Sequence, residues 1–218
     1  MRIAADIDEA GMTCKGELMD FVSDLIYKEM LTKVIETGTY LGTGSTMALI
    51  NGLTRTGKQF QFYSIECNPI FFRQAKRNVP RLRGIHLVNG LTVSRSDLPL
   101  EVSLKGYPDD IIVDHQENER EKLYLSETDF RVPDDALEDC LHSMSYMPDL
   151  VVLDSAGHMG WIEFEYLMKR VKGPFYLALD DTNHIKHYKT AEYVRERYEI
   201  VFSTEDKFGG LCAYIPLS

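Results

Sequence analysis

The sequence has few cysteines, no long apolar run and a shortage of positive charge. Cys14, Cys67, Cys140 and Cys212 are far apart and form no Cys-x-x-Cys pair, which argues against a zinc knuckle or a disulfide framework and favours free thiols. No apolar stretch reaches the ~18–20 residues of a membrane span, and residues 1–16 lack the basic and apolar regions of a signal peptide. These absences predict a cytoplasmic protein.

The charge balance restricts the partners. The 218 residues include 24 basic and 34 acidic side chains, giving a net charge of −10. Nucleic acids and anionic membrane surfaces attract lysine and arginine, so the acidic excess argues against both. The length suits a single domain over residues 1–218, and 44% hydrophobic content is that of a globular protein. We expect a small-molecule substrate, with homo-oligomerisation left open.

Apolar segments of two kinds alternate along the chain. Helical periodicity is found at 17–30, 47–53, 71–78, 161–170 and 189–197. Short apolar runs predict strands at 33–35, 60–65, 85–88, 149–153, 175–179, 200–203 and 211–215. Such alternation predicts an α/β fold with a mostly parallel seven-stranded sheet and helices on both faces. The last two strands are spaced like a hairpin, which predicts a reversed terminal strand.

One segment interrupts this alternation. The chain between the third strand and Asp149 is much longer than a crossover needs. Within it, we interpret about 95–133 as an insertion that forms a substrate lid over the active edge of the sheet, with a short strand at 111–113. A solvated loop is the alternative. A helix is expected from 133 to 147.

A glycine-rich turn follows the first strand. Its pattern is Glu36-x-Gly38-x-x-x-Gly42-x-Gly44, and Ser45 stands near the start of the next helix. Glycines let a backbone approach a ligand closely, and a helix N-terminus offers free N–H groups. The pattern differs from the Gly-x-Gly-x-x-Gly that holds a pyrophosphate.

Two acids define the ligand expected at this turn. Glu66 ends the second strand, where a carboxylate can accept the hydroxyls of a ribose. Glu36 precedes the turn, where it would repel a diphosphate but could hold an ammonium group. A ligand with a ribose and a positive charge fits both acids, and S-adenosylmethionine is such a ligand.

Carboxylates also end two later strands. Asp154 follows the strand at 149–153, and Asp180 and Asp181 follow the strand at 175–179. The carboxyl ends of neighbouring parallel strands line one crevice, so we expect the three acids to cluster. Clustered carboxylates repel unless a cation neutralises them, and oxygen ligands favour magnesium, calcium or manganese. Capping of the next helix is the alternative for Asp180 or Asp181.

These motifs resemble those of the class I S-adenosylmethionine-dependent methyltransferases. Residues 35–45 are similar to their first motif, and 64–66 to their second. Within the class, residues 151–158 and 177–181 look most like the metal-dependent small-molecule O-methyltransferases, of the deoxysugar and cephalosporin-hydroxylase-like types. The resemblance implies a Rossmann-like fold, S-adenosylmethionine as cofactor with Gly90 and Leu91 among its contacts, and Mg²⁺ or another divalent cation on the three aspartates.

The resemblance also implies a general base shortly after the first metal aspartate. We take His158 as this base, with Asp154 as the second catalytic residue, although the spacing is about one residue longer than in the family. His184 and His187 are the alternatives, because they follow Asp181 closely.

The predicted function is therefore metal-assisted O-methylation of a small hydroxylated molecule, such as a sugar or a natural-product intermediate. Three alternatives remain: a hydroxylase-like relative with other chemistry, a non-catalytic S-adenosylmethionine-binding accessory protein, and a dinucleotide oxidoreductase. The acidic charge and the lack of an Asn/Asp-Pro-Pro-Tyr-like tetrapeptide argue against a nucleic-acid methyltransferase.

Overall fold

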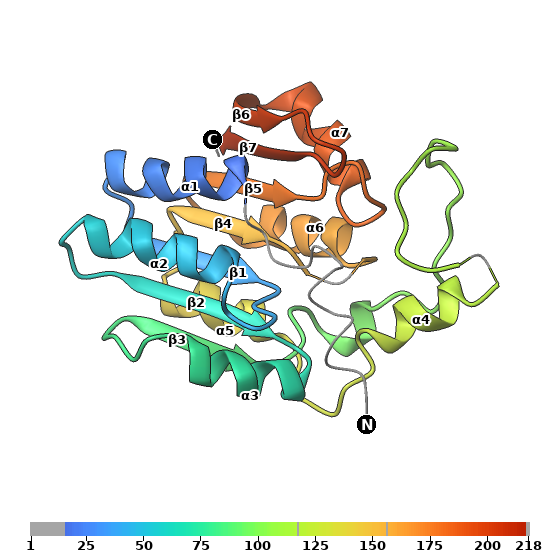
Figure 1. Ribbon diagram of the computed structural model, residues 1–218, viewed down its shortest axis with the longest axis horizontal. Coiled ribbons are helices and arrows are strands. Elements are labelled where there is room, and N and C mark those ends of the chain that lie inside the picture. Colours follow the sequence, from blue (N-terminus) through green and yellow to red (C-terminus); the bar gives the residue numbers. More distant parts are fainter. Residues whose placement is uncertain (1–15, 117, 156, 217–218) are drawn as a thin grey trace.

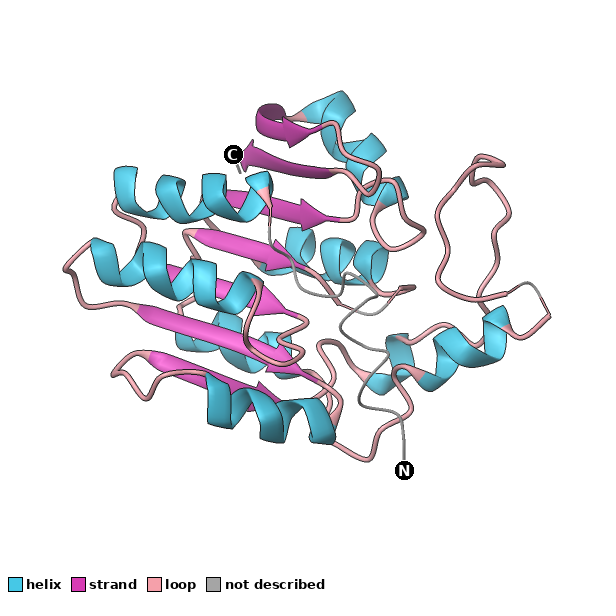
Figure 2. Ribbon diagram, viewed as in Figure 1, coloured by secondary structure: helices cyan, strands magenta, loops and turns pink. Residues whose placement is uncertain are grey.

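The computed structural model describes residues 16–116, 118–155 and 157–216, which form a seven-stranded sheet between two layers of helices (Figures 1 and 2). Cys14 and Ala156, both part of the sequence predictions, lie outside the described residues. Within the described ranges, Cys67, Cys140 and Cys212 are free thiols, as predicted. No helix in these ranges is long and apolar enough to cross a membrane.

Strands and helices alternate as the sequence predicts. The strands are β1 (Lys33–Thr37), β2 (Gln61–Glu66), β3 (Ile85–Asn89), β4 (Leu150–Leu153), β5 (Phe175–Asp180), β6 (Glu199–Thr204) and β7 (Gly210–Ile215). The α-helices are α1 (Glu17–Lys28), α2 (Ser45–Arg55), α3 (Pro69–Asn78), α4 (Arg120–Ser126), α5 (Ala136–Ser143), α6 (Gly160–Arg170) and α7 (Tyr188–Arg197).

The strand order is β3-β2-β1-β4-β5-β7-β6. The first five strands in this order are parallel, whereas β7 runs antiparallel to both β5 and β6. This confirms the predicted mostly parallel sheet with a reversed terminal strand. The parallel register places Glu36 beside Ser64 and Thr37 beside Leu153, so the glycine turn lies next to the ends of β2 and β4.

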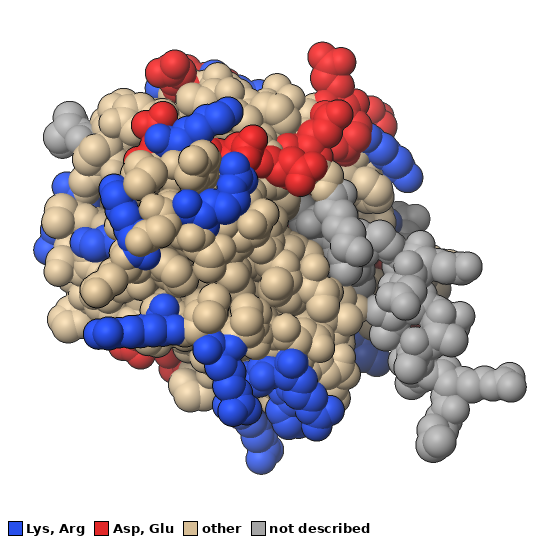
Figure 3. Space-filling model, turned by 60° about the vertical axis from the view of Figure 1, so that its left-hand side comes forward, with Lys and Arg blue, Asp and Glu red and all other residues tan. Residues whose placement is uncertain are grey.

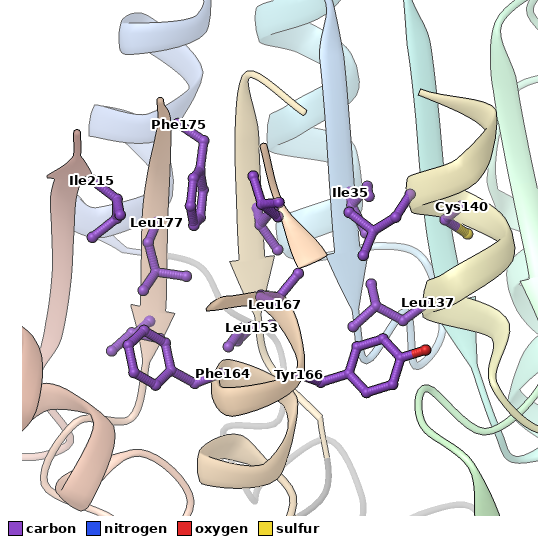
Figure 4. Close-up of a cluster of buried hydrophobic side chains, with 14 of the residues drawn as sticks. Ile35, Leu137, Cys140, Leu153, Phe164, Tyr166, Leu167, Phe175, Leu177 and Ile215 are labelled. Carbon is purple, nitrogen blue, oxygen red and sulfur yellow. The ribbon is translucent and has the colours of Figure 1, made fainter. Parts of the chain in front are cut away.

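Helices cover both faces, which explains the uninterrupted apolar sequences of the central strands. All four residues of β4 are buried. On one face, α1 and α2 pack on a core that includes Val34 and Val152. On the other, α5, α6 and α7 pack on a core that includes Leu137, Phe164 and Leu177 (Figure 4). The sheet is thus a rigid platform whose strand ends can position side chains.

The segment 95–133 is largely irregular and lies beyond the carboxyl ends of the strands, with α4 in its second half (Figure 1). The short strand predicted at 111–113 is wrong in extent, because only Ile112 forms a bridge, to His184. The helix predicted over 133–147 is also too long. It begins after Asp135 and ends before Ser145, since both residues adopt left-handed backbone conformations, with φ of 63° and 60°.

Candidate active site

The carboxyl ends of β1, β2, β4 and β5 meet at one edge of the sheet, which faces the segment 95–133 (Figure 1). In open α/β sheets this edge is where ligands bind. The candidate residues fall into two groups along it. The glycine turn and Glu66 belong to β1 and β2, and the three aspartates belong to β4 and β5.

Glu66 closes β2 and contacts the glycine turn. Its Oε2 accepts a hydrogen bond from the backbone N–H of Tyr40 at 2.7 Å, and its Oε1 accepts one from that of Asn68 at 2.7 Å. Burial raises the pKa of this carboxyl to about 7, although both hydrogen bonds oppose the shift. A carboxylate has about four acceptor sites in all, so Glu66 retains capacity for a ligand hydroxyl.

Glu36 lies deeper than the sequence suggests. Its side chain is fully buried, and its Oε2 accepts hydrogen bonds from Thr46 Oγ1 at 2.7 Å and Ser64 Oγ at 2.6 Å. Ser45, the first residue of α2, also bonds to this carboxyl. Burial raises the pKa of Glu36 despite these hydroxyl partners. Glu36 therefore ties β1, β2 and α2 together, and its predicted contact with a ligand ammonium stays a prediction.

Two glycines of the turn are needed for contacts within the chain. Gly38 has a φ of 83°, and a Cβ there would lie only 2.0 Å from the carbonyl oxygen of Asp154. Gly42 has a φ of 68°, and a Cβ there would lie 2.6 Å from a methyl group of Val79. Gly44 is the N-cap of α2. Their predicted approach to a cofactor stays a prediction, since close packing alone accounts for Gly38 and Gly42.

Gly90 and Leu91 follow β3 and hold the end of the insertion. The backbone N–H of Leu91 donates to the carbonyl of Pro133 at 2.9 Å, and the Leu91 carbonyl accepts from Ala136 at 2.9 Å. A Cβ at Gly90 would lie 2.9 Å from the Pro133 carbonyl oxygen. The N–H of Gly90 also donates to the Glu66 carbonyl at 3.2 Å, so the segment after β3 is fixed beside the end of β2, while its contact with a cofactor stays a prediction.

The three aspartates converge as predicted. Asp154, Asp180 and Asp181 each offer a carboxylate oxygen, and these oxygens all lie within 4.8 Å of one another. The parallel pairing of Leu153 with Leu179 brings the ends of β4 and β5 together and causes this convergence. Asp181 adopts a left-handed backbone, with a φ of 56°.

A lysine that the sequence interpretation missed occupies this cluster. Lys186 Nζ lies 2.5 Å from Asp154 Oδ1 and 2.7 Å from Asp181 Oδ2. Its side chain is only 9% exposed. Burial by itself lowers the pKa of Lys186, but Asp154, Asp181 and Asp180 outweigh burial and hold that pKa well above the usual value. The lysine is therefore an ammonium ion at the centre of the acidic edge.

This lysine decides how well a metal fits. The oxygen donors are those that magnesium prefers, but Mg²⁺ requires them at about 2.0–2.1 Å from one point. Two of the three carboxylates already contact the Lys186 ammonium. With Lys186 in this position, Asp154, Asp180 and Asp181 do not fit a divalent cation in addition to the lysine ammonium.

The candidate bases differ in access. His184 Nδ1 accepts from the Lys186 backbone N–H at 3.1 Å, and its Nε2 lies 3.0 Å from Asp114 Oδ2. His187 is fully buried. His158 is half-buried, and neither of its ring nitrogens has a hydrogen-bond partner among the described residues. Burial lowers the pKa of His158 to about 4, so its ring is neutral at pH 7. Of the three, His158 is the least buried residue, and both of its ring nitrogens are shielded from solvent without a hydrogen-bond partner among the described residues.

A second missed residue lies beneath the edge. Glu163, in the first turn of α6, is fully buried and accepts a hydrogen bond from Thr37 Oγ1 at 3.0 Å. The hydroxyls of Ser155 and Thr92 also bond to it, while burial raises its pKa. No sequence signal could have singled it out, because acids are common in the first turn of helices. For Lys186 a signal was present, because it lies between the candidate bases His184 and His187 in the sequence.

Known proteins identify the fold. No family model and no curated protein matches the sequence. Among solved structures, an O-methyltransferase from Bacillus cereus in complex with SAH gives a TM-score of 0.60 at 13% identity, covering 97% of this chain and 86% of that chain. The chain has a methyltransferase fold. The O-methyltransferase TomG from Streptomyces achromogenes, involved in tomaymycin synthesis and bound to SAM, gives 0.57 at 12% identity, with 97% and 85% covered.

Cofactor-bound Rv0187 from MTB is similar to this chain as well, with a TM-score of 0.56 at 15% identity, covering 93% of this chain and 81% of that chain. The fold that the sequence motifs predicted is therefore confirmed over nearly the whole chain. At such low identities the likeness concerns architecture, and ligand and reaction are argued from the residues themselves.

Proposed function

We propose that the protein is an S-adenosylmethionine-dependent methyltransferase that methylates a hydroxyl group of a small molecule. The observation that carries this proposal is Glu66, an acceptor at the end of β2 whose carboxyl contacts the backbone of the glycine turn at 2.7 Å. A ribose bound over that turn would meet this carboxyl. The methyltransferase-fold structures with bound SAH and SAM support the same cofactor class.

The residues divide the work between two neighbouring sites. In the proposed reaction the cofactor supplies a methyl group on a positively charged sulfur. The turn with Gly38, Gly42, Gly44 and Ser45 would cradle it, with the residues at 90–91 alongside, and Glu66 would accept the ribose hydroxyls. The acceptor molecule would lie by the aspartates, under the lid proposed for 95–133. Catalysis then depends mainly on alignment of the two reacting atoms.

His158 is the proposed proton acceptor, with Asp154, four positions earlier in the chain, as the second catalytic residue. The ring of His158 is neutral at pH 7 because burial lowers its pKa to about 4. Such a weak base removes a proton only once the acceptor oxygen has begun to bond to the methyl carbon, since that oxygen then becomes acidic. The proton leaves after or during methyl transfer, and no alkoxide is required.

Mg²⁺ or another divalent cation was expected on Asp154, Asp180 and Asp181. Because Lys186 contacts two of these carboxylates, the proposed reaction is written without a metal step. A positive charge near the acceptor oxygen is still present, and the protein itself provides it.

Calorimetry with S-adenosylhomocysteine tests the proposal. Wild-type protein should bind it, and Glu66→Ala should weaken binding by ~1.5–3 kcal/mol, the range for hydrogen bonds to a charged group. Asn68→Ala is the matched control. Asn68 caps α3 in the same turn through Ile70, so this variant disturbs the loop and keeps the acceptor. Tight NADH binding without any response to S-adenosylhomocysteine would contradict the proposal and favour an oxidoreductase.

Transfer itself separates an enzyme from an accessory protein. Wild-type protein should move the labelled methyl group of S-adenosylmethionine to at least one member of a panel of sugar and polyphenol acceptors. His158→Ala should keep cofactor affinity and lose most of this transfer, since general-base removal costs typically ~10²–10⁴-fold. Binding without transfer to any acceptor would favour the accessory protein.

A further inference from the structure

We infer that Lys186 is the built-in cation of the acidic edge, and that this chain takes no divalent metal there as long as the lysine is present. The inference rests on the proposed function only in treating this edge as the acceptor site. Metal binding can be measured without cofactor or turnover, so the two can fail independently.

The contacts are those of a cation bound by carboxylates. Lys186 Nζ lies 2.5 Å from Asp154 Oδ1 and 2.7 Å from Asp181 Oδ2, which are the short distances of charge-assisted hydrogen bonds. The side chains of Asp154 and Asp181 are 17% and 31% exposed, against 9% for that of Lys186. The ammonium therefore sits on the protein side of the cluster, where water and dissolved ions have least access.

The backbone around Lys186 is held on several sides. Its own N–H donates to His184 Nδ1, and the N–H of Ile185 donates to the Ile112 carbonyl at 3.0 Å. The carbonyl oxygen of Lys186 packs so closely on Gly160 that a Cβ there would lie 2.2 Å away. A metal ion could not enter simply by moving this segment aside, since these contacts with the insertion and with α6 would have to break.

A cation that belongs to the chain has consequences that an exchangeable metal lacks. Chelators cannot remove it, so the cluster should be neutralised in any buffer. Removing the lysine charge, in contrast, would leave three carboxylates together, which repel one another and present an oxygen site for a divalent ion.

Titration of chelator-stripped, cofactor-free protein with Mn²⁺ and Mg²⁺ tests the inference. Wild type should show no saturable binding at micromolar metal. Lys186→Met keeps the length of the side chain and removes its charge, and should bind Mn²⁺ at least about tenfold more tightly than wild type, with a melting temperature that rises on metal addition. Lys169→Met, an exposed lysine on α6, is the matched control and should behave like wild type.

Each result decides the matter. Micromolar binding to wild type that Lys186→Met leaves unchanged or weakens overturns the inference, because the lysine would then yield to the metal. Absence of binding to both proteins also overturns it, because the carboxylates would lack metal affinity even when free of the lysine. If Lys186→Met folds only with Mn²⁺, the rescue supports the inference. If it does not fold at all, the wild-type titration decides alone. S-adenosylhomocysteine binding, measured in parallel, reports separately on the proposed function.

Discussion

At Glu66, the position of the side chain in the fold determines its ionisation. It lies at a strand end where a ligand is proposed to bind, yet it is buried enough that its pKa is raised to about 7. A carboxyl with a raised pKa is protonated over part of the physiological range. Only the ionised form offers both oxygens as acceptors for ribose hydroxyls.

The affinity for S-adenosylhomocysteine should therefore depend on pH. It should fall as the pH drops below about 7, by up to about tenfold per pH unit, because binding must first ionise Glu66. Calorimetry between pH 5.5 and 8.5 measures this. Glu66→Gln does not titrate, so its weaker affinity should change little over the same interval. A flat wild-type profile would show that Glu66 does not contact the ligand as a carboxylate.

Gly38 shows how one missing side chain fixes two strands. Gly38→Ala should destabilise the protein by several kcal/mol, since the new Cβ would lie 2.0 Å from the Asp154 carbonyl oxygen in addition to the strain of a positive φ. Gly57→Ala is the control. Gly57 also has a positive φ, of 66°, but nothing lies within 4 Å of its Cβ position, so only about 1 kcal/mol of strain is expected. Urea unfolding of both variants compares the two costs, and equal losses would contradict the argument.

At the scale of elements, the loop between β5 and α7 is held from two directions. The carbonyls of Gly209 and Phe208, in the β6–β7 hairpin, accept hydrogen bonds from the N–H groups of Thr182 and Asn183. On the other side, Ile112 of the insertion pairs with this loop, and Asp114 lies 3.0 Å from His184. The loop that carries Lys186 is thus clamped between a hairpin and an insertion.

Asp114→Ala should loosen this clamp. It removes the carboxylate beside His184, whose interaction also lowers the pKa of Asp114. Amide hydrogen exchange in 183–187 should become roughly threefold to tenfold faster, the effect of losing one hydrogen bond of about 1 kcal/mol, whereas exchange in β1 and β2 should not change. Asp110→Ala, an exposed acid of the same segment, is the control. Equal exchange in both variants would mean that Asp114 does not hold the loop.

At the scale of the whole molecule, the surface charge predicts that the protein does not bind nucleic acid. The net charge is −10, and on the face drawn in Figure 3 lysine and arginine form separate groups, with acidic side chains gathered along one border. We expect no binding of a labelled DNA duplex in fluorescence anisotropy at 0.15 M salt, nor at lower salt, because phosphate binding needs a continuous basic surface. Binding that weakens steeply with added salt would contradict this.

Much of this architecture could be predicted because it depends on patterns among residues that are close in the sequence. Apolar runs at strand positions and helical periodicity are properties of neighbouring residues, so all seven strands were located and the convergence of Asp154 with Asp180 and Asp181 followed from sheet geometry. The ends of α5 were not predicted correctly, since left-handed residues such as Asp135 leave no periodic signal in the sequence.

The sequence interpretation missed what depends on contacts between loops. Lys186 pairs with Asp154 from 32 positions away along the chain, and no spacing rule reports such a contact. The hydroxyls of Thr46 and Ser64 surround the Glu36 carboxyl in the interior, which the sequence interpretation also missed, while the predicted contact of Glu36 with a ligand ammonium stays a prediction. Both sets of contacts were missed for the same reason, because burial of a polar group depends on the partners that tertiary structure brings to it.

The strand order has a consequence for the timing of assembly during synthesis. Of the seven strands, β7 is synthesised last, yet it lies between β5 and β6. The hairpin that connects β6 to β7 accepts hydrogen bonds from Thr182 and Asn183. A ribosome that has released only residues up to about Asn89 has already delivered the glycine turn, Glu66 and their strands. The loop with Lys186 cannot make its contacts with the hairpin until residues 208–215 have been synthesised. The residues of the glycine turn therefore leave the ribosome early but still await Asp154, against which Gly38 packs, and the acidic half of the edge is completed among the last contacts of the fold.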